Sequence, residues 1–265
     1  MAVPFDHIAT SYDLDFTNSV IGQLQRKRVW RFLEEILPEM AGLEILELNC
    51  GTGEDAVLFG DRGFNIVATD ISEEMLKVTQ QKVEQFSLQH KISSHYLDLE
   101  AFDETIFNKK FDLIFSNFGG LNCINPEALQ KLLNKIPSIL TPGGRFVAVI
   151  MPRYCLWEAF YFLSKFQFKN AFRRWTNKEV QANLNGVSQK TWYYQPRQIK
   201  KWARKSFLHV NSMSVGISIP PSYMEKFFTK RKRWLFWQYS LEKKLSRYSL
   251  FSGFADHYII DFRVE

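Results

Sequence analysis

A buried strand that runs into a glycine-rich turn is the feature of this sequence that most restricts its fold. The run LEILELNCGTGEDA occupies residues 43–56, with Gly51 and Gly53 placed just before a helical pattern. Free backbone N–H groups at the start of that helix attract a ligand's polar groups, and small residues let the ligand approach the main chain. Asp70 ends the next strand-like run, where a carboxylate can accept hydrogen bonds from both hydroxyls of a ribose. The segment therefore predicts a nucleoside-containing cofactor.

The first 150 residues alternate helical patterns with short β-type runs, which is typical of a parallel sheet covered by helices. Apolar residues recur at near-helical spacing over residues 20–37, and Pro38 ends that pattern. Strands are expected at 43–48, 65–69, 92–97, 111–115 and 145–150, and helices at about 54–60, 73–86 and 126–140. This order predicts an α/β, Rossmann-like, doubly wound fold.

The remaining 115 residues interrupt and then resume this alternation. Aromatic residues at 154, 157, 161, 168 and 172 suit an amphipathic helix, and Asn185-Gly186 predicts a hairpin between 179–184 and 187–194. A helix at about 196–205, a strand at 208–219, a long basic helix at about 222–248 and a closing strand at 257–264 should follow. We therefore expect a cofactor-binding core over 1–150 and a lid that selects the acceptor over 151–194. Residues 195–265 then complete the sheet and carry a basic helical insertion at about 220–250.

Two classes of nucleoside cofactor fit the glycine turn. The spacing of Gly51, Gly53 and Ala56, with Asp70 downstream, also satisfies the loose dinucleotide-binding fingerprint. Glu47 favours the other class, because a carboxylate beside the turn repels a pyrophosphate and attracts a cation. S-adenosylmethionine (SAM) carries that positive charge on its sulfonium and ammonium groups. The alternative is that Glu47 only accepts hydrogen bonds from N–H groups of the loop.

At this point the sequence resembles the class I SAM-dependent methyltransferases. ELNCGTG at 47–53 is similar to the family's acidic-x-Gly-x-Gly-x-Gly loop, and VATDIS at 67–72 is similar to its ribose-binding strand end. YLDL at 96–99, FDLIFSNFGGLN at 111–122 and LTPGGRF at 140–146 resemble its third, fourth and fifth strand motifs. The resemblance implies a mainly parallel seven-stranded sheet with an antiparallel last strand, SAM as cofactor and S-adenosylhomocysteine as its product.

The resemblance also implies which residues bind the cofactor. The opening FDHIATSYD at 5–13 is similar to that of small-molecule methyltransferases, whose tyrosine, here Tyr12, covers the methionine end of SAM. Arg28 is a candidate to neutralise the SAM carboxylate, with an exposed helical arginine as the alternative. Asn49 replaces the family's first loop glycine, but asparagine tolerates positive φ. The full set is Tyr12, Arg28, Glu47, Asn49, Cys50, Gly51, Gly53, Asp70, Ile71, Met75, Leu97, Asp98, Leu99, Asn117 and Phe118.

The catalytic residues are the least specified part of the site. Methyl transfer is an in-line displacement at an activated carbon, so alignment supplies much of the rate and no metal is required. An oxygen or nitrogen nucleophile can need a general base, for which histidine is the first candidate. His7, in the N-terminal segment, and His257, at the start of the closing strand, are the best placed of the five histidines. Tyr193 could orient an acceptor, with simple packing as the alternative.

Charge is divided unevenly along the chain, although the net charge is only +6. Residues 151–250 hold 20 Lys and Arg against 4 Asp and Glu, and 22 of the 41 aromatic residues. The segment 226–237 mixes both kinds of residue, which suits a solvated helix face, an anionic membrane surface, an acidic carrier protein or a nucleic acid. Asn117 is followed by Phe-Gly-Gly, unlike the Asn-Pro-Pro-Tyr type of base-modifying methyltransferases, so nucleic acid is the less favoured partner.

The rest of the composition restricts where such a chain works. Three widely spaced cysteines, Cys50, Cys123 and Cys155, indicate neither a disulfide framework nor a zinc site. The first residues lack the apolar core of a secretory signal, and every apolar run is shorter than a membrane span. We therefore expect a cytoplasmic protein, soluble or peripheral to a membrane.

These observations predict a SAM-dependent methyltransferase that acts at oxygen or carbon of a small organic or lipid-like acceptor. One alternative is an RNA or protein methyltransferase that docks through the basic residues of 151–250. Another is a regulatory protein that binds SAM without turnover.

Overall fold

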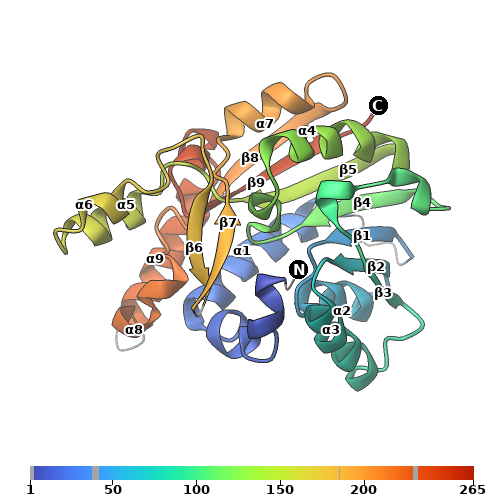
Figure 1. The fold of residues 1–265 in the computed structure, drawn as a ribbon, viewed down its shortest axis with the longest axis horizontal. Helices are drawn as coiled ribbons and strands as arrows, with labels where there is room; N and C mark the ends of the chain where they lie inside the picture. The colour runs from blue at the N-terminus through green and yellow to red at the C-terminus, as the bar shows by residue number, and fades with distance from the viewer. Residues whose placement is uncertain (1–2, 38–41, 185, 229–231) are drawn as a thin grey trace.

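The fold is an α/β sandwich around one seven-stranded sheet, as the computed structural model shows for residues 3–37, 42–184, 186–228 and 232–265 (Figure 1). The strand order is β3-β2-β1-β4-β5-β9-β8. Their bounds are β1 Glu44–Leu48, β2 Asn65–Asp70, β3 Ile92–Tyr96, β4 Phe111–Ser116, β5 Leu140–Ile150, β8 Leu208–Val215 and β9 His257–Arg263. Strands β1 to β5 pair in parallel, whereas β9 runs antiparallel to both β5 and β8. The predicted Rossmann-like sheet with an antiparallel last strand is confirmed.

Helices cover both faces of the sheet and bury two apolar clusters. One cluster joins the sheet to α1 Val20–Ile36, α2 Glu54–Asp61 and α3 Glu73–Gln85. The other joins the opposite face to α4 Pro126–Lys135 and α7 Pro196–Ala203. Successive strand residues point to opposite faces, so Glu47 shares the α1 and α2 side with Ile45. Glu47 therefore lies beneath α1 and α2, and both of these helices also carry charged residues.

Short helical turns connect these elements and cap the larger helices. They are η1 Pro4–Ile8, η2 Asp13–Thr17, η3 Leu99–Ala101, η4 Glu104–Ile106, η5 Gly120–Cys123, η6 Ile136–Ile139, η7 Ser222–Met224 and η9 Ser249–Gly253. Side-chain oxygens cap the helix starts, as at Ser72, which accepts a 3.1 Å hydrogen bond from the Met75 amide. Helix boundaries in the core therefore follow local sequence signals.

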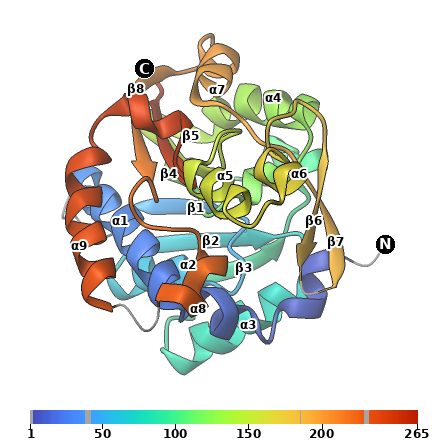
Figure 2. The same cartoon turned by 90° about the vertical axis from the view of Figure 1, so that its left-hand side faces the viewer.

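The predicted aromatic helix after β5 is instead two short helices, α5 Leu156–Leu163 and α6 Phe168–Ala171. Phe166 lies between them with a φ of 57°, a left-handed conformation that a continuous helix does not contain. The predicted hairpin is present as β6 Val180–Leu184 and β7 Val187–Thr191. Asn185, which the sequence predicts in the turn, lies outside the described residues. Figure 2 shows α5 and α6 in front of the sheet, between α9 and the hairpin.

The expected long basic helix is also divided. Helix α8 covers Glu225–Phe228 and α9 covers Lys232–Leu245. Lys230 and Arg231, part of the predicted basic aromatic segment, lie outside the described residues. Within the described ranges, no helix combines the length and apolar character needed to cross a bilayer.

Candidate functional site

The glycine turn between β1 and α2 leaves open space beside its backbone. Asn49, Gly51 and Gly53 have φ values of 56°, 56° and 75°. The expectation that Asn49 tolerates positive φ is confirmed, and its side chain turns toward β4, where Ser116 donates a 3.2 Å hydrogen bond to Asn49 Oδ1. A Cβ added at Gly51 would meet no atom within 4 Å. A ligand can therefore approach the main chain at Gly51.

Asp70, at the end of β2, lies against this turn. Its Oδ2 accepts a hydrogen bond from the Gly51 amide and its Oδ1 accepts one from the Ser72 amide, each at 2.9 Å. Each carboxylate oxygen keeps a second lone pair for a further donor. Burial raises the pKa of Asp70, although these amides lower it. The carboxylate is thus positioned at the cradle that Gly51 opens.

Glu47 is a buried acid with an unsatisfied oxygen. Its side chain is 1% exposed, and its Oε2 has no hydrogen-bond partner. Burial raises the pKa of Glu47 well above its ordinary value, and the neighbouring charge of Asp55 raises it further. The Ala56 amide donates one hydrogen bond to Glu47. The alternative, that Glu47 only accepts hydrogen bonds from N–H groups of the loop, therefore accounts for only part of this carboxylate. An orphaned carboxylate oxygen in a buried site favours a cationic ligand.

A buried ion pair between α1 and α2 stands beside Glu47. Arg26 contacts Asp55 at 2.7 Å, and Asp55 also accepts hydrogen bonds from Trp30 and from Asn117 at 2.8 Å. Burial lowers the pKa of Arg26, but the charge of Asp55 raises it above its ordinary value overall. The Arg26 guanidinium also lies 4.9 Å from the centre of the Phe118 ring. Arg26 and Asp55 are polar site residues that sequence reasoning missed.

The structure turns Arg28 away from this group. Its Nε donates a 3.0 Å hydrogen bond to Ser246 Oγ, and its terminal nitrogen lies 3.6 Å from the sulfur of Met213. Two positions along an α-helix are about 200° apart around its axis, so Arg26 and Arg28 face opposite sides of α1. Arg28 is therefore neither at the predicted cofactor residues nor exposed on the helix, the two positions that the sequence analysis considered. Arg26 and Trp30, four residues apart, share the face of α1 that contacts Asp55, but the sequence alone does not show which face that is.

The N-terminal turns cover the same edge of the sheet. Asp6 accepts a 2.6 Å hydrogen bond from Ser72, and Asp13 accepts one of 2.7 Å from Thr52. Tyr12 packs on Phe16 with ring centres 5.1 Å apart. Burial raises the pKa of Tyr12, Arg26 lowers it and Asp70 raises it further, which places the phenol within electrostatic reach of both. Tyr12 therefore lies with the predicted cofactor residues.

The other predicted cofactor residues border this group or support it from the core. Asp98 caps η3 by accepting a 2.9 Å hydrogen bond from the Glu100 amide, between buried Leu97 and Leu99. Phe118 has a φ of 40°, and strained backbone of this kind often accompanies function. Ile71 is half-buried after β2, Met75 is buried under Ile8 and Ala9, and Cys50 is buried with a free thiol.

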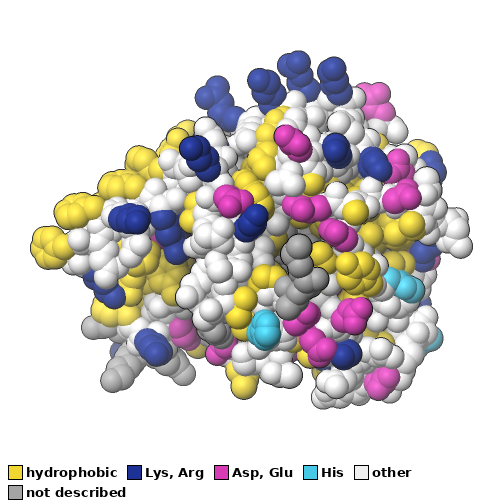
Figure 3. Space-filling model, viewed as in Figure 1, with side chains coloured by type: hydrophobic (Ala, Val, Ile, Leu, Met, Phe, Trp, Pro, Cys, Tyr) yellow, Lys and Arg dark blue, Asp and Glu magenta, His cyan; other side chains and the backbone are white. Residues whose placement is uncertain are grey.

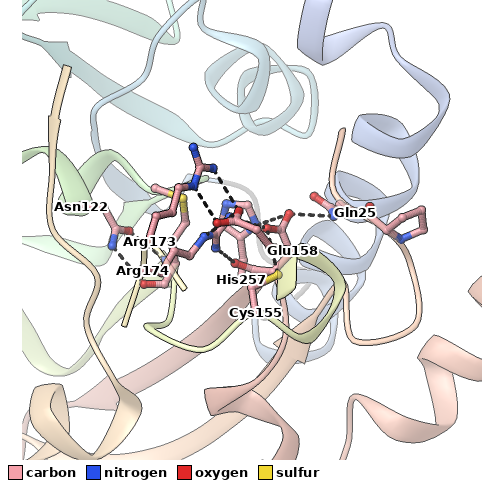
Figure 4. A network of polar contacts seen from close by, with 10 residues as sticks. Gln25, Asn122, Cys155, Glu158, Arg173, Arg174 and His257 are labelled. Atoms are coloured by element: carbon pink, nitrogen blue, oxygen red, sulfur yellow. Dashed lines mark hydrogen bonds and ion pairs between the residues drawn. The ribbon is translucent and has the colours of Figure 1, made fainter. Parts of the chain in front are cut away.

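A second polar group ties the segment after β5 to the start of β9 (Figure 4). Glu158 of α5 receives both Arg173, at 2.7 Å, and Arg174, at 2.8 Å. Arg174 continues to Asp256 at 3.2 Å, and Asp256 also accepts a 3.3 Å hydrogen bond from Gln25. Burial alone raises the pKa of Asp256, but His257, Arg174 and Gln25 together hold it well below its ordinary value. We call Glu158, Arg173, Arg174 and Asp256 the lid network.

His257 and Tyr193 adjoin the lid network, whereas His7 does not. The Nδ1 of His257 lies 3.3 Å from Asp256, and its ring meets that of Phe118 edge to face. The Arg174 guanidinium lies 5.0 Å from the centre of the buried Tyr193 ring. Burial raises the pKa of Tyr193, while Arg174 and Arg173 lower it. His7 is solvent-exposed on η1. No group of three or more His, Cys, Asp or Glu side chains that could hold a metal occurs within the described ranges.

Residues 45–144 match a family model described as a methyltransferase domain. Among curated proteins, the demethylmenaquinone methyltransferase of Paenarthrobacter aurescens (strain TC1) is 28% identical over 163 residues, which cover 61% of this chain and 59% of that protein. The matched region thus spans less than two thirds of that relative.

Solved structures of methyltransferases have the same fold. The CcbJ methyltransferase of Streptomyces caelestis superposes with a TM-score of 0.65 at 14% identity, covering 99% of this chain and 98% of that one. The geranyl diphosphate C-methyltransferase of Streptomyces coelicolor A3(2), solved with Mg²⁺, geranyl diphosphate and S-adenosylhomocysteine, superposes with a TM-score of 0.58 at 12% identity. It covers 91% of this chain and 81% of that one. At these identities the similarity concerns the fold.

Proposed function

We propose that the chain is a class I SAM-dependent methyltransferase and that it methylates a small, lipid-like organic acceptor at oxygen or carbon. The observation that carries the proposal is the buried Glu47, whose Oε2 lacks a partner beside the open glycine turn. A cofactor with positive charge satisfies that oxygen, whereas a pyrophosphate meets repulsion there. The choice of acceptor class is supported by the similarity to a demethylmenaquinone methyltransferase and by the fold neighbour solved with geranyl diphosphate.

The cofactor residues divide into three groups. Asp70 would hold the ribose hydroxyls, and Asp98 with Leu97 and Leu99 would border the adenine. Tyr12 and Glu47 would bind the methionine end, with Arg26 in the role first expected of Arg28. Arg26 fits because its guanidinium is buried between Asp55 and Phe118. Asn117 and Phe118 would lie next to the transferred methyl group.

The cofactor supplies a methyl group already activated by its sulfonium sulfur, so the protein must orient the acceptor and receive a proton. His257 is the candidate for that proton, because its imidazole adjoins Phe118 on one side and Asp256 on the other. The Asp256 carboxylate would orient the imidazole and stabilise its protonated form. Tyr193 would orient the acceptor from the lid. His7 remains the alternative base, on the N-terminal segment.

The lid over residues 151–194 would enclose the acceptor. Asn122 ties it to the sheet, because its side-chain amide donates to the carbonyl oxygens of Met151, at 3.1 Å, and Trp192, at 2.6 Å. Tyr154 and Trp175 meet edge to face 5.1 Å apart, so aromatic side chains continue from this edge into the lid. An apolar or aromatic acceptor matches these side chains.

A second candidate function is methylation of RNA or protein. Figure 3 shows Lys and Arg side chains gathered over α7 and the turn after it, in agreement with the excess of 20 basic over 4 acidic residues in 151–250. Such a surface favours polyanions. A SAM-binding protein without turnover is the non-enzymatic alternative, which a turnover assay excludes or supports.

Calorimetry with SAM, S-adenosylhomocysteine and NAD tests the cofactor assignment. We expect binding of the first two and none of NAD, and Asp70→Ala should weaken SAM binding. Tight NAD binding without SAM binding would contradict the proposal.

A further inference from the structure

The two helices after β5 form a projecting tip with an apolar surface. We define the aromatic tip as residues 156–175. Figure 1 shows α5 and α6 extending beyond the sheet and the other helices, and Figure 3 shows apolar side chains gathered there. Seven large apolar side chains in this range are exposed: Leu156, Phe160, Leu163, Phe166, Phe168, Phe172 and Trp175. A helical segment packed wholly onto the core would not leave these seven side chains exposed.

The exposed charge of the aromatic tip is entirely positive. Lys165 and Lys169 are exposed, and Arg173 is half-buried. Its one acid, Glu158, has a 2% exposed side chain that is paired with Arg173 and Arg174. A surface with apolar side chains and no exposed carboxylate complements an anionic, partly apolar partner.

The exposure does not come from a loosely attached segment. The Trp157 indole donates a 3.1 Å hydrogen bond to the Ile217 carbonyl, and its ring packs edge to face on Phe228. Tyr223 of η7 packs on both Tyr161 and Phe162, at 5.5 and 6.1 Å. Together with the lid network, these contacts hold the base of the tip firmly while its end stays outside the core.

Phe166 is the clearest sign that the end of the tip serves a partner. It combines a φ of 57°, which is costly for a bulky residue, with a side chain that is 83% exposed. The strained backbone does not bury this side chain. Aromatic side chains are favoured at the boundary between lipid headgroups and acyl chains. A projecting tip can enter this boundary more readily than a flat protein surface can.

We propose that the aromatic tip inserts shallowly into an anionic lipid bilayer, with Phe160, Phe166 and Phe168 in the headgroup–acyl boundary and Lys165 and Lys169 at the lipid phosphates. Docking itself is independent of catalysis; only its use, delivery of a lipid-like acceptor to the lid, rests on the proposed function. This location differs from residues 226–237, for which the sequence offered an anionic membrane surface as one of several interpretations.

Vesicle co-sedimentation tests the proposal without cofactor or acceptor. The full chain should bind vesicles of equal parts phosphatidylcholine and phosphatidylglycerol, and bind phosphatidylcholine alone about tenfold or more weakly. The variant Phe160→Ser/Phe166→Ser/Phe168→Ser should lose binding about tenfold or more, and so should Lys165→Glu/Lys169→Glu. The control Phe86→Ser/Ile106→Ser/Leu250→Ser removes three comparably exposed side chains elsewhere and should bind as the parent does. Circular dichroism and thermal unfolding establish that each variant is folded.

Several outcomes would overturn the proposal: no vesicle binding by the parent chain, equal binding to both compositions, or unchanged binding by the triple tip variant. A concentration-dependent dimer that the triple variant abolishes, without vesicle binding, would assign the tip to a second copy instead. The Asp70→Ala variant separates this proposal from the proposed function, since it should lose SAM affinity and keep vesicle binding.

Discussion

The rings of His257 and Phe118 meet edge to face, with centroids 5.5 Å apart and planes 89° apart. Phe118 follows β4 on the predicted cofactor side, and His257 begins β9 next to the lid network. This contact joins the proposed methyl-transfer position to the one histidine that also adjoins a buried carboxylate among the described residues. It makes His257 the first residue to test.

His257→Asn should lower turnover by about 10²–10⁴-fold and leave SAM affinity nearly unchanged, because the imidazole would take the acceptor's proton without holding the cofactor. Single-turnover rates and calorimetry with SAM measure the two quantities. His7→Asn is the matched control, and a larger loss in that variant would move the base to the N-terminal segment.

Glu47→Gln should stabilise the cofactor-free chain at neutral pH while weakening SAM binding. The folded-state pKa of Glu47 is raised, so the folded chain keeps this proton at pH values where the unfolded chain has lost it. Stability therefore falls as pH rises above the unfolded value of 4.5, and an uncharged amide removes that cost. Each 1 kcal/mol gained corresponds to a Tm rise of about 2–4 °C. A lower Tm at pH 7 would contradict this account.

The same carboxylate predicts a pH dependence of binding. A cationic ligand favours ionised Glu47, so binding releases a proton and SAM affinity should rise with pH. Calorimetry in buffers with different ionisation enthalpies detects that proton. Its absence in the parent chain, or its persistence in Glu47→Gln, would show that Glu47 does not face the positive charge.

Arg26→Met and Arg28→Met form a matched pair on one helix. The first should weaken SAM binding about tenfold or more, because it leaves Asp55 unpaired beside the site and removes the proposed partner of the cofactor carboxylate. The second should leave SAM affinity within about twofold, since Arg28 contacts Ser246 and Met213 on the other side. The reverse pattern would restore the role first expected of Arg28.

Glu158→Gln should destabilise the fold by about 3–5 kcal/mol, because it removes the shared carboxylate of two arginines and leaves the buried Arg174 with Asp256 alone. Lys190→Gln breaks the exposed pair with Glu179 and should cost about 1 kcal/mol or less. Urea unfolding of both variants gives the comparison. Equal small losses would mean that the lid network does not hold the lid in place.

Local sequence signals predicted most of the sheet and its glycine turn. The positive φ of Asn49 and the alternation of helices and strands up to β5 depend on the conformational preferences of individual residues and their near neighbours, which the sequence shows directly. The rotation of α1 about its axis decides which of its side chains faces which partner. It depends on residues far along the chain, since Arg28 contacts Ser246 and Arg26 contacts Asp55. No pattern within residues 20–37 contains that information, so the sequence could not show that Arg26 rather than Arg28 faces Asp55.

The lid shows the same limit in another form. Aromatic spacing over 154–172 suits one amphipathic helix, but Phe166 breaks it, and the buried charges of Glu158 and Arg174 hold the base of the tip. Arg174 reaches Asp256, which is 82 residues away in the sequence. A contact of this kind becomes visible only when β9 returns beside β5.

The most direct test of the central claim is transfer of labelled methyl from SAM by the parent chain, with Asp70→Ala as control, in fractionated cell extract. The account predicts label in the lipid or small-molecule fraction with the parent chain and strongly reduced label with the variant. Label in RNA or protein, or no transfer by a chain that binds SAM, would contradict it.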